Sequence, residues 1–279
     1  MDESLLEIFA KEIGGIFREH HLTRTSGTDI HALSIAEAYA VQERFVADRI
    51  GHGERVVGYK VGCTSPAIRV QLGLSQPICG RLMSGHVYRD GATLGVNGCV
   101  DCGLEAELVL RIGRDLDGSN LETGYLRGAI ATVSPGIEVH NYRFWYGPPS
   151  SQELIASNGI HAAIIIGVPQ ELPTDLDLGQ ERTTLVVNGA EVSFGFAAEL
   201  MDGGGPIESL RWLINHLKGR NHVLRAGDIV IPGAATQLIP VKAGDVAEAR
   251  FTRFGSCRAS FSDQSHQKSR LTNGKNQLY

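Results

Sequence analysis

Two glutamates with the spacing of a metal site lie in an apolar stretch of the chain. Glu105 and Glu107 belong to residues 104–112, whose composition predicts a largely buried strand. Side chains alternate between the faces of a strand, so both carboxylates share one face with Val109. Neighbouring buried anions repel each other and lose hydration, and a hard cation such as Mg²⁺ or Mn²⁺ relieves both penalties. An edge strand with a solvated face is the alternative that needs no metal. The opposite face can enter a core, since it carries Leu104, Ala106, Leu108 and Leu110.

A third glutamate, Glu138, lies in a second extended and apolar stretch, residues 131–140. Three buried carboxylates from two strands would supply three oxygen ligands and leave about three positions of an octahedral ion for water or substrate. Open positions are typical of a catalytic metal site rather than a structural one. We therefore expect Glu105, Glu107 and Glu138 to bind one divalent cation.

Four polar residues near these strands are further candidates. Lys60 lies in the predicted strand 55–62, where its ammonium either reaches solvent or faces the carboxylates as an acid or base. His140 shares the face of Glu138, two residues away. Asn158 and His161 flank Gly159 ahead of the predicted strand 161–167, at a possible pocket edge. For each histidine, plain packing is the alternative.

The composition excludes several classes of protein. The 279 residues carry a net charge of −5 with acids and bases interspersed, so no basic surface for nucleic acid is expected. No apolar run reaches the roughly 20 residues of a membrane span. The five cysteines argue against a disulfide framework, and Cys99-x-x-Cys102 lacks a partner motif for zinc or redox chemistry. The N-terminal segment is acidic and amphipathic, unlike a signal peptide, which favours a cytoplasmic protein.

The elements that must position these residues follow from periodicity and caps. Helices are predicted mainly near the N-terminus and strands mainly toward the C-terminus, which favours an α+β fold with an N-terminal helical region. We expect one catalytic domain over residues 1–262, with a helical part and lid at 1–92 and a β-rich metal-binding core at 93–262. The polar tail 263–279 is predicted to be disordered. Helices are expected at 3–19, 34–51, 66–73 and 206–217, a loop at 142–157, and a hairpin turn at Asn188-Gly189.

These segments together resemble a known family. The resemblance rests on five motifs: Gly58-Tyr-Lys-Val-Gly-Cys-Thr-Ser65, Leu72-Gly-Leu-Ser-Gln-Pro77, Glu105-Ala-Glu107, Gly113-Arg-Asp-Leu116, and Glu138 ahead of Arg143. In this order and spacing they resemble the 2-keto-4-pentenoate hydratases and 4-oxalocrotonate decarboxylases of the fumarylacetoacetate hydrolase superfamily. Asn158, the hairpin at Asn188 and the segments 226–230 and 241–245 extend the resemblance to about residue 261.

The resemblance implies a mixed β-roll fold, homo-oligomers, a Mg²⁺ or Mn²⁺ ion on the three glutamates, and Lys60 in catalysis. It implies a lyase of aromatic catabolism that hydrates a 2-hydroxy-2,4-dienoate to a 4-hydroxy-2-oxo acid. Alternatives are a 4-oxalocrotonate-type decarboxylase and an acylpyruvate-type C–C hydrolase. A non-enzymatic alternative is an inactive homologue that supports a related hydratase or decarboxylase in a complex.

The chain departs from the family around the expected substrate. Ile78 stands where an aspartate is common, and Asn158-Gly-Ile-His161 replaces part of an Asp-Asn-Ala-Ser stretch. His140 precedes Asn141, Tyr142 and Arg143 where the family often has an aliphatic residue and then Asp-Ser-Arg. We predict that Arg143, His140, Asn158 and Ile78 bind substrate. His161, with His140 as second choice, is predicted to replace the missing acid in proton transfer or to bind a substrate carboxylate.

Overall fold

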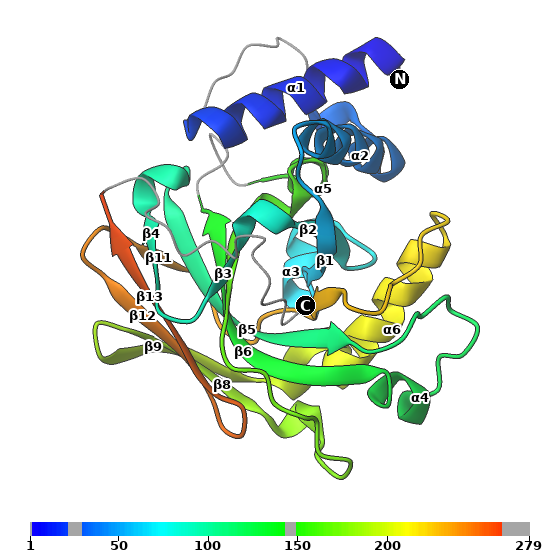
Figure 1. Ribbon diagram of the computed structural model, residues 1–279. Coiled ribbons are helices and arrows are strands. Elements are labelled where there is room, and N and C mark those ends of the chain that lie inside the picture. Colours follow the sequence, from blue (N-terminus) through cyan, green and yellow to red (C-terminus); the bar gives the residue numbers. More distant parts are fainter. Residues whose placement is uncertain (1, 22–29, 143–148, 264–279) are drawn as a thin grey trace.

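The strand that carries Glu105 and Glu107 lies at the centre of the larger of two sheets. The computed structural model describes residues 2–21, 30–142 and 149–263. Strand β5 (Cys102–Ile112) pairs along its length with the antiparallel β6 (Ile130–Asn141). The sheet order is β2-β1-β10-β5-β6-β7-β3, and β11 also pairs with β5 (Figure 1). The other strands are β1 (Val56–Gly62), β2 (Ile78–Met83), β3 (Val87–Arg89), β7 (His161–Ile166), β10 (Ile229–Ile231) and β11 (Ile239–Val241).

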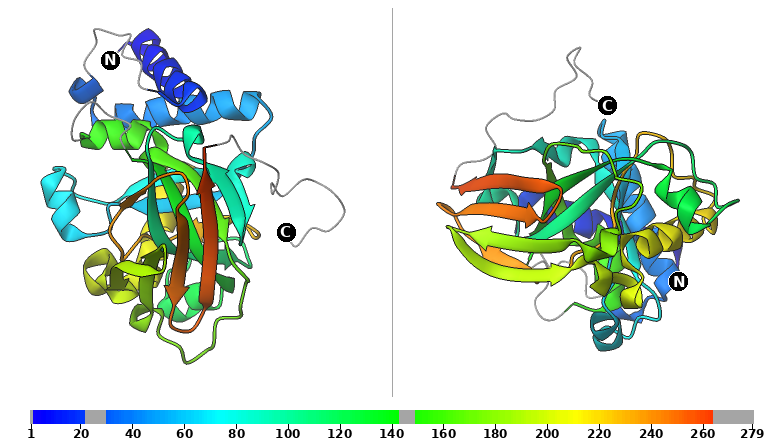
Figure 2. Two further views of the ribbon diagram at one scale, coloured as in Figure 1. Left: turned by 90° about the vertical axis from the view of Figure 1, so that its left-hand side faces the viewer. Right: turned by 90° about the horizontal axis from the view of Figure 1, so that it is seen from below.

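A second sheet of five strands packs beside the first and completes a curled, roll-like core (Figure 2). Its order is β4-β13-β12-β8-β9, and the β8–β9 hairpin turns at Asn188 and Gly189, as predicted. Both turn residues have positive φ, 53° and 82°, which suits a tight two-residue turn. The mixed fold with its helical N-terminus confirms the predicted class. The strands are β4 (Ala92–Gly95), β8 (Arg182–Val187), β9 (Ala190–Phe196), β12 (Val246–Phe251) and β13 (Gly255–Ser262).

The N-terminal helices gather at one end of the larger sheet (Figure 1). Helix α1 (Glu3–Glu19) buries one apolar face against α2 (Ile35–Gly51). The expected capping box is present, since Ser34 Oγ accepts from the Glu37 N–H and Glu37 bonds back to Ser34 N. No helix in the described ranges is long and apolar enough to cross a membrane. The remaining helices are α3 (Pro66–Gln71), α4 (Thr123–Arg127), α5 (Ser151–Ala156) and α6 (Gly205–Lys218), with short 3₁₀ turns at Ile30–Ala32, Ser84–His86, Val96–Gly98, Asn158–Ile160, Leu178–Gln180 and Ala197–Gly203.

The prediction of a loop over 142–157 is wrong for its second half, where α5 forms. A second capping box explains the helix, because Ser150 Oγ accepts from the Glu153 N–H and the Glu153 carboxylate accepts from Ser150 N. Residues 143–148 and 264–279 lie outside the described residues, and the disorder predicted for the tail is therefore not tested. The strands that end before residue 93, β1, β2 and β3, belong to the larger sheet, and β4 crosses that position; the division of the chain there stays a prediction.

The two faces of β5 behave as their alternation predicts. Leu104, Ala106, Leu108 and Leu110 all belong to the main core. Val109, on the face of the glutamates, packs instead in a small separate cluster with Leu82, Val87, Ile164, Ile229 and Ile231. The face that carries the glutamates is therefore closed by its own apolar cluster, next to the carboxylates.

Candidate active site

The three glutamates share one face of the β5–β6 ribbon. Glu105 lies directly opposite Glu138 in the register, and Glu107 lies opposite Gly136. Strand β5 is paired on both sides, so the solvated edge strand is excluded. Glu107 and Glu138 are buried, and the Oε2 atom of each lacks a hydrogen-bond partner among the described residues. Buried carboxylate oxygens without partners are costly, and a divalent cation would satisfy them.

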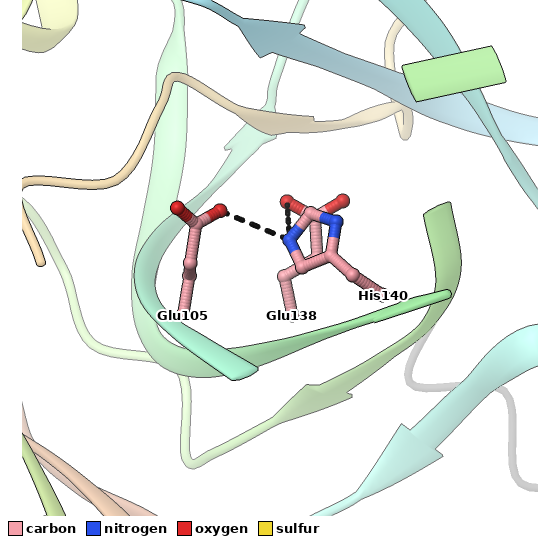
Figure 3. A group of neighbouring side chains, drawn as sticks. All are labelled: Glu105, Glu138 and His140. Carbon is pink, nitrogen blue, oxygen red and sulfur yellow. Dashed lines mark ion pairs between the residues drawn. The ribbon is translucent and has the colours of Figure 1, made fainter. Parts of the chain in front are cut away.

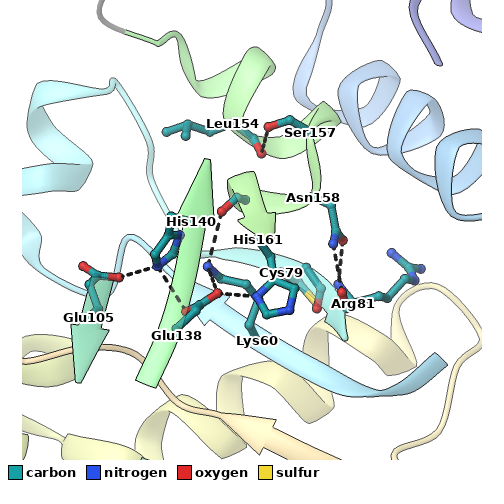
Figure 4. A network of polar contacts seen from close by, with 12 residues as sticks. Lys60, Cys79, Arg81, Glu105, Glu138, His140, Leu154, Ser157, Asn158 and His161 are labelled. Carbon is teal, nitrogen blue, oxygen red and sulfur yellow. Dashed lines mark hydrogen bonds and ion pairs between the residues drawn. The ribbon is translucent and has the colours of Figure 1, made fainter. Parts of the chain in front are cut away.

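Lys60 faces these carboxylates rather than solvent. Its Nζ lies 2.6 Å from Glu138 Oε1 and donates to the Gly159 carbonyl oxygen at 3.3 Å (Figure 4). Glycines make room for the side chain, since a Cβ added at Gly80 would lie 2.9 Å from Lys60 Cγ. Burial alone would lower the pKa of Lys60, but Glu138 and the other two glutamates outweigh it and raise that pKa. The side chain is therefore a buried ammonium paired with Glu138.

His161 contacts the same oxygen of Glu138. Its Nδ1 lies 2.7 Å from Oε1, and because a carboxylate only accepts, Nδ1 carries the proton of this bond. Nε2 is then left as a bare lone pair, buried and without a partner in the described chain. Burial lowers the pKa of His161 to about 4, although Glu138 opposes that shift. The ring is neutral around pH 7 and presents an acceptor.

A β-bulge brings His161 to this face. The β6–β7 register runs regularly from Gly136 to Val139 and then shifts, so that His140 pairs with His161 and Ala162 is the extra residue. Without the shift, strand alternation would turn His161 to the face opposite that of Ile164. Bulges often redirect a side chain beside an active site. Sequence spacing alone could not place His161 on Glu138.

His140 lies between the two glutamates that face each other (Figure 3). Its Nε2 is 2.9 Å from Glu105 Oε2 and 3.5 Å from Glu138 Oε2. One ligand atom from each of Glu105, Glu138 and His140 lies within 4.8 Å of the others, the spacing of a possible metal site. Glu107, the third predicted ligand, is adjacent on β5 but outside this trio.

Charge is unevenly shared among the carboxylates. Burial raises the pKa of Glu107 well above its usual value, and the charges of Glu138 and Glu105 add to the rise. Burial opposes ionisation of Glu138 too, but Lys60, His140 and His161 outweigh it and hold that pKa below its usual range. The two buried glutamates thus differ, since the pKa of Glu107 is raised and that of Glu138 is lowered.

A left-handed turn holds the acceptor of Lys60 in place. Asn158, Gly159 and Ile160 have consecutive positive φ angles of 61°, 64° and 52°. This is a strained state for a β-branched residue such as Ile160, and strain of this kind clusters at functional sites. The Asn158 side chain closes the turn by accepting from Arg81 N at 2.6 Å and donating to Arg81 O at 2.8 Å. Both ends of its amide thus contact β2, and the predicted contact of Asn158 with substrate stays a prediction.

Gln42 is a buried polar residue near the candidate site that the sequence analysis does not single out. It is fully buried on α2 and donates to Cys79 O at 2.9 Å and to Ile155 O at 2.7 Å. Its side-chain oxygen accepts from Arg81 Nη1 at 2.5 Å. These bonds tie α2 to β2 and to α5. The sequence signal that could have identified Gln42 is its position as a polar residue on the apolar face of α2.

The remaining predicted positions are less central. Ile78 is buried on β2 opposite Gly62, two residues beyond Lys60 along β1. Arg143 lies outside the described residues. Cys99 and Cys102 are free thiols, and their dispensability stays a prediction.

The profile of the family described as "Fumarylacetoacetate (FAA) hydrolase C-terminal" matches residues 84–262. The chain belongs to the fumarylacetoacetate hydrolase family. Among curated members, it is 34% identical over 226 residues to a 2-keto-4-pentenoate hydratase of Paraburkholderia phymatum, which covers 81% of this chain and 86% of that protein. It is 32% identical over 234 residues to the TodF product hydratase of Pseudomonas putida, which covers 84% of this chain and 85% of that protein.

A solved structure extends the family likeness to three dimensions. The 4-oxalocrotonate decarboxylase from Pseudomonas putida G7, complexed with magnesium and adipate, superposes with a TM-score of 0.87 at 27% identity. The match covers 94% of this chain and 98% of that one, so the helical N-terminus is included. The predicted resemblance and fold are both confirmed.

Proposed function

We propose that this fumarylacetoacetate hydrolase family member is a metal-dependent hydro-lyase. Its substrate would be a small 2-hydroxy-2,4-dienoate of the 2-keto-4-pentenoate type, hydrated to a 4-hydroxy-2-oxo acid in aromatic catabolism. The observation that carries the proposal is the buried face where three glutamates meet the ammonium of Lys60 and the free lone pair of His161. The 2-keto-4-pentenoate and 2-hydroxyhexa-2,4-dienoate hydratases among the relatives support this substrate class.

The donor set suits Mg²⁺ or Mn²⁺. Glu105, Glu107 and Glu138 would hold the ion through carboxylate oxygens, two of which lack hydrogen-bond partners in the described structure. One dication and the ammonium of Lys60 together match the charge of three carboxylates. When bound, the ion supplies Lewis-acid stabilisation of the negative charge that develops on the substrate's C2 oxygen.

The chain's own residues divide the proton transfers. Lys60, charged and held by Glu138 and Gly159, donates a proton to C5 of the dienol, and the C2 hydroxyl proton passes to the Lys60 amine, which gives an enone. Water then adds at C4, His161 Nε2 accepts a proton from that water, and this proton is delivered to C3 of the resulting enolate. The hydrogen bond from Nδ1 to Glu138 fixes the tautomer that leaves Nε2 free. Both side chains are buried and contact Glu138 Oε1.

The binding of the remainder of the substrate is part of the same proposal. Ile78 would form an apolar wall where an acid is common in the family, and His140 and Asn158 would border the pocket. Arg143 would pair with a substrate carboxylate. We further propose that residues 1–262 act as one cytoplasmic catalytic unit, that the enzyme forms homo-oligomers, and that it can associate with a related hydratase or decarboxylase.

Decarboxylation is the second candidate, and the likeness to the 4-oxalocrotonate decarboxylase favours it. The same enolate stabilisation would then serve loss of CO₂. A panel of 2-hydroxydienoates, 4-oxalocrotonate and acylpyruvates, assayed with Mg²⁺ or Mn²⁺, separates the possibilities. Loss of dienol absorbance without CO₂ supports the hydratase, and CO₂ release supports the decarboxylase. Cleavage of an acylpyruvate indicates a C–C hydrolase, and no turnover at all indicates an inactive homologue.

A further inference from the structure

The contact of His140 with the facing glutamates is not an ordinary ion pair. Its Nε2 lies 2.9 Å from Glu105 Oε2, yet neither ring nitrogen makes an aligned hydrogen bond to any described residue. The side chain is only 4% exposed, so water does not readily replace the missing partner. A buried imidazole that is close to two carboxylates but bonded to neither points to a missing common partner.

The spacing of the three atoms fits such a partner. Around an octahedral dication with ligands about 2.1 Å away, neighbouring ligand atoms lie about 3 Å apart. His140 Nε2 is 2.9 Å from Glu105 Oε2 and 3.5 Å from Glu138 Oε2. All three atoms lie within 4.8 Å of one another.

The two oxygens of Glu138 are already divided between two roles. Oε1 contacts Lys60 Nζ at 2.6 Å and His161 Nδ1 at 2.7 Å. Oε2 has no hydrogen bond in the described chain and is the oxygen nearer His140. Glu107 Oε2, buried and unpartnered on the same face, is a further donor. The oxygen of Glu138 that is left free is thus the one that faces the imidazole.

We propose that His140 is itself a metal ligand through Nε2, and that this nitrogen makes the site select Mn²⁺ or another first-row transition ion over Mg²⁺. Imidazole suits transition metals, whereas Mg²⁺ prefers oxygen ligands throughout. The inference rests on the proposed metal site and changes its chemistry from all-oxygen to mixed oxygen and nitrogen.

His161 provides a matched control. It is buried as deeply as His140 and contacts the same glutamate, but through a genuine hydrogen bond to the other oxygen. If proximity of any imidazole to Glu138 were sufficient, the two histidines would behave alike. The proposal requires that they differ.

The first measurement is calorimetric titration of the metal-free wild type, His140→Val and His161→Asn with Mn²⁺ and with Mg²⁺. We expect the wild type to bind Mn²⁺ about a hundredfold more tightly than Mg²⁺. His140→Val should weaken Mn²⁺ binding about tenfold or more and change Mg²⁺ binding by less than about threefold. His161→Asn should keep the wild-type ratio. Equal losses for both ions in His140→Val would overturn the proposal.

The second measurement is electron spin echo envelope modulation of bound Mn²⁺, which detects a directly bonded nitrogen. The ¹⁴N signal should be present in wild type and His161→Asn and absent in His140→Val. Wild type labelled with ¹⁵N-histidine should show the shifted signal, which tests the ligand even if His140→Val does not fold. Absence of the nitrogen signal in wild type, or its loss only in His161→Asn, would overturn the proposal.

The outcome is separable from that of the proposed function. Turnover of the dienoate by an enzyme whose Mn²⁺ shows no nitrogen ligand would refute the role of His140 and leave the hydratase standing. A nitrogen-ligated Mn²⁺ in a protein that turns over none of the panel would support the role of His140 and refute the hydratase.

Discussion

Replacement of Lys60 by methionine tests the charge balance of the site most directly. Methionine keeps nearly the length of the lysine stem and fits the space beside Gly80 and Gly159 while removing the ammonium. Glu138 Oε1 then loses a cation 2.6 Å away, in a place where the lysine side chain is only 5% exposed. Two buried carboxylates and the half-buried carboxylate of Glu105 remain on one face without their ammonium.

The structure sets the expected magnitude. Opposite unit charges at this separation attract by about 6 kcal/mol at an effective dielectric of about 20. Removal of the buried lysine also relieves its own desolvation penalty, so a loss of about 3–5 kcal/mol in the unfolding free energy of the metal-free protein is expected. Turnover should fall by a factor of about 10²–10⁴ if Lys60 transfers a proton. Metal affinity should move the opposite way and rise about tenfold, because the carboxylates no longer share their charge with an ammonium.

Urea unfolding with and without Mn²⁺, calorimetric metal titration and dienoate turnover measure the three effects. Lys11→Met is the control, since Lys11 pairs with Glu7 at 3.5 Å on the surface and its loss should change stability by about 1 kcal/mol or less. A Lys60→Met enzyme with wild-type stability and unchanged metal affinity would refute the argument that this ammonium neutralises the carboxylates.

Three further changes test individual contacts. Glu138→Gln should weaken metal binding and turnover with the fold retained, measured by calorimetry and circular dichroism; turnover insensitive to EDTA in wild type would contradict the metal role. His161→Ser should lower kcat at least about 30-fold, or about 2 kcal/mol. Because the pKa of His161 is lowered to about 4 and the base acts when neutral, wild-type activity should fall as the pH drops through about 4, and the variant's pH–rate profile should lose that limb. Gly80→Ala should lose about 1–3 kcal/mol of stability and much of the turnover, since its Cβ would lie 2.9 Å from Lys60 Cγ. Gly15→Ala, in open space on α1, should instead stabilise by up to about 1 kcal/mol, and equal effects of the two would argue against a specific clash.

Local sequence patterns predicted helices and strands correctly where a single signal, such as strand alternation or a capping box, was clear. Alternation along β5 placed Glu105 and Glu107 on one face, and the capping box at Ser34 marked the start of α2. The same box at Ser150 was missed because the preceding Gly-Pro-Pro segment favoured a loop. Pairing of Glu105 with Glu138 depends on register, a long-range property that neither strand's sequence contains alone.

The contacts of the two histidines could not be read from spacing. His161 reaches Glu138 because β7 accommodates Ala162 as a bulge, and no composition signal marks that bulge. His140 was expected to share the face of Glu138, and it does, but its distance to Glu105 requires the register of two strands. Gln42 carried a visible signal, a polar side chain among apolar helix positions, which becomes meaningful only with its partners on β2 and α5.

The bulge at Ala162 in β7 decides on which side of the sheet the His161 ring lies. If β7 ran as a regular strand with Ala162 retained, alternation would turn the His161 ring to the opposite side of the sheet. Two relatives with the same histidine and glutamate in an alignment can therefore differ in whether those side chains meet. The contact between His161 and Glu138 therefore depends on the bulge as well as on the identity of the two residues. Loss of the bulge with Ala162 retained would abolish the Glu138–His161 pair without substituting either residue.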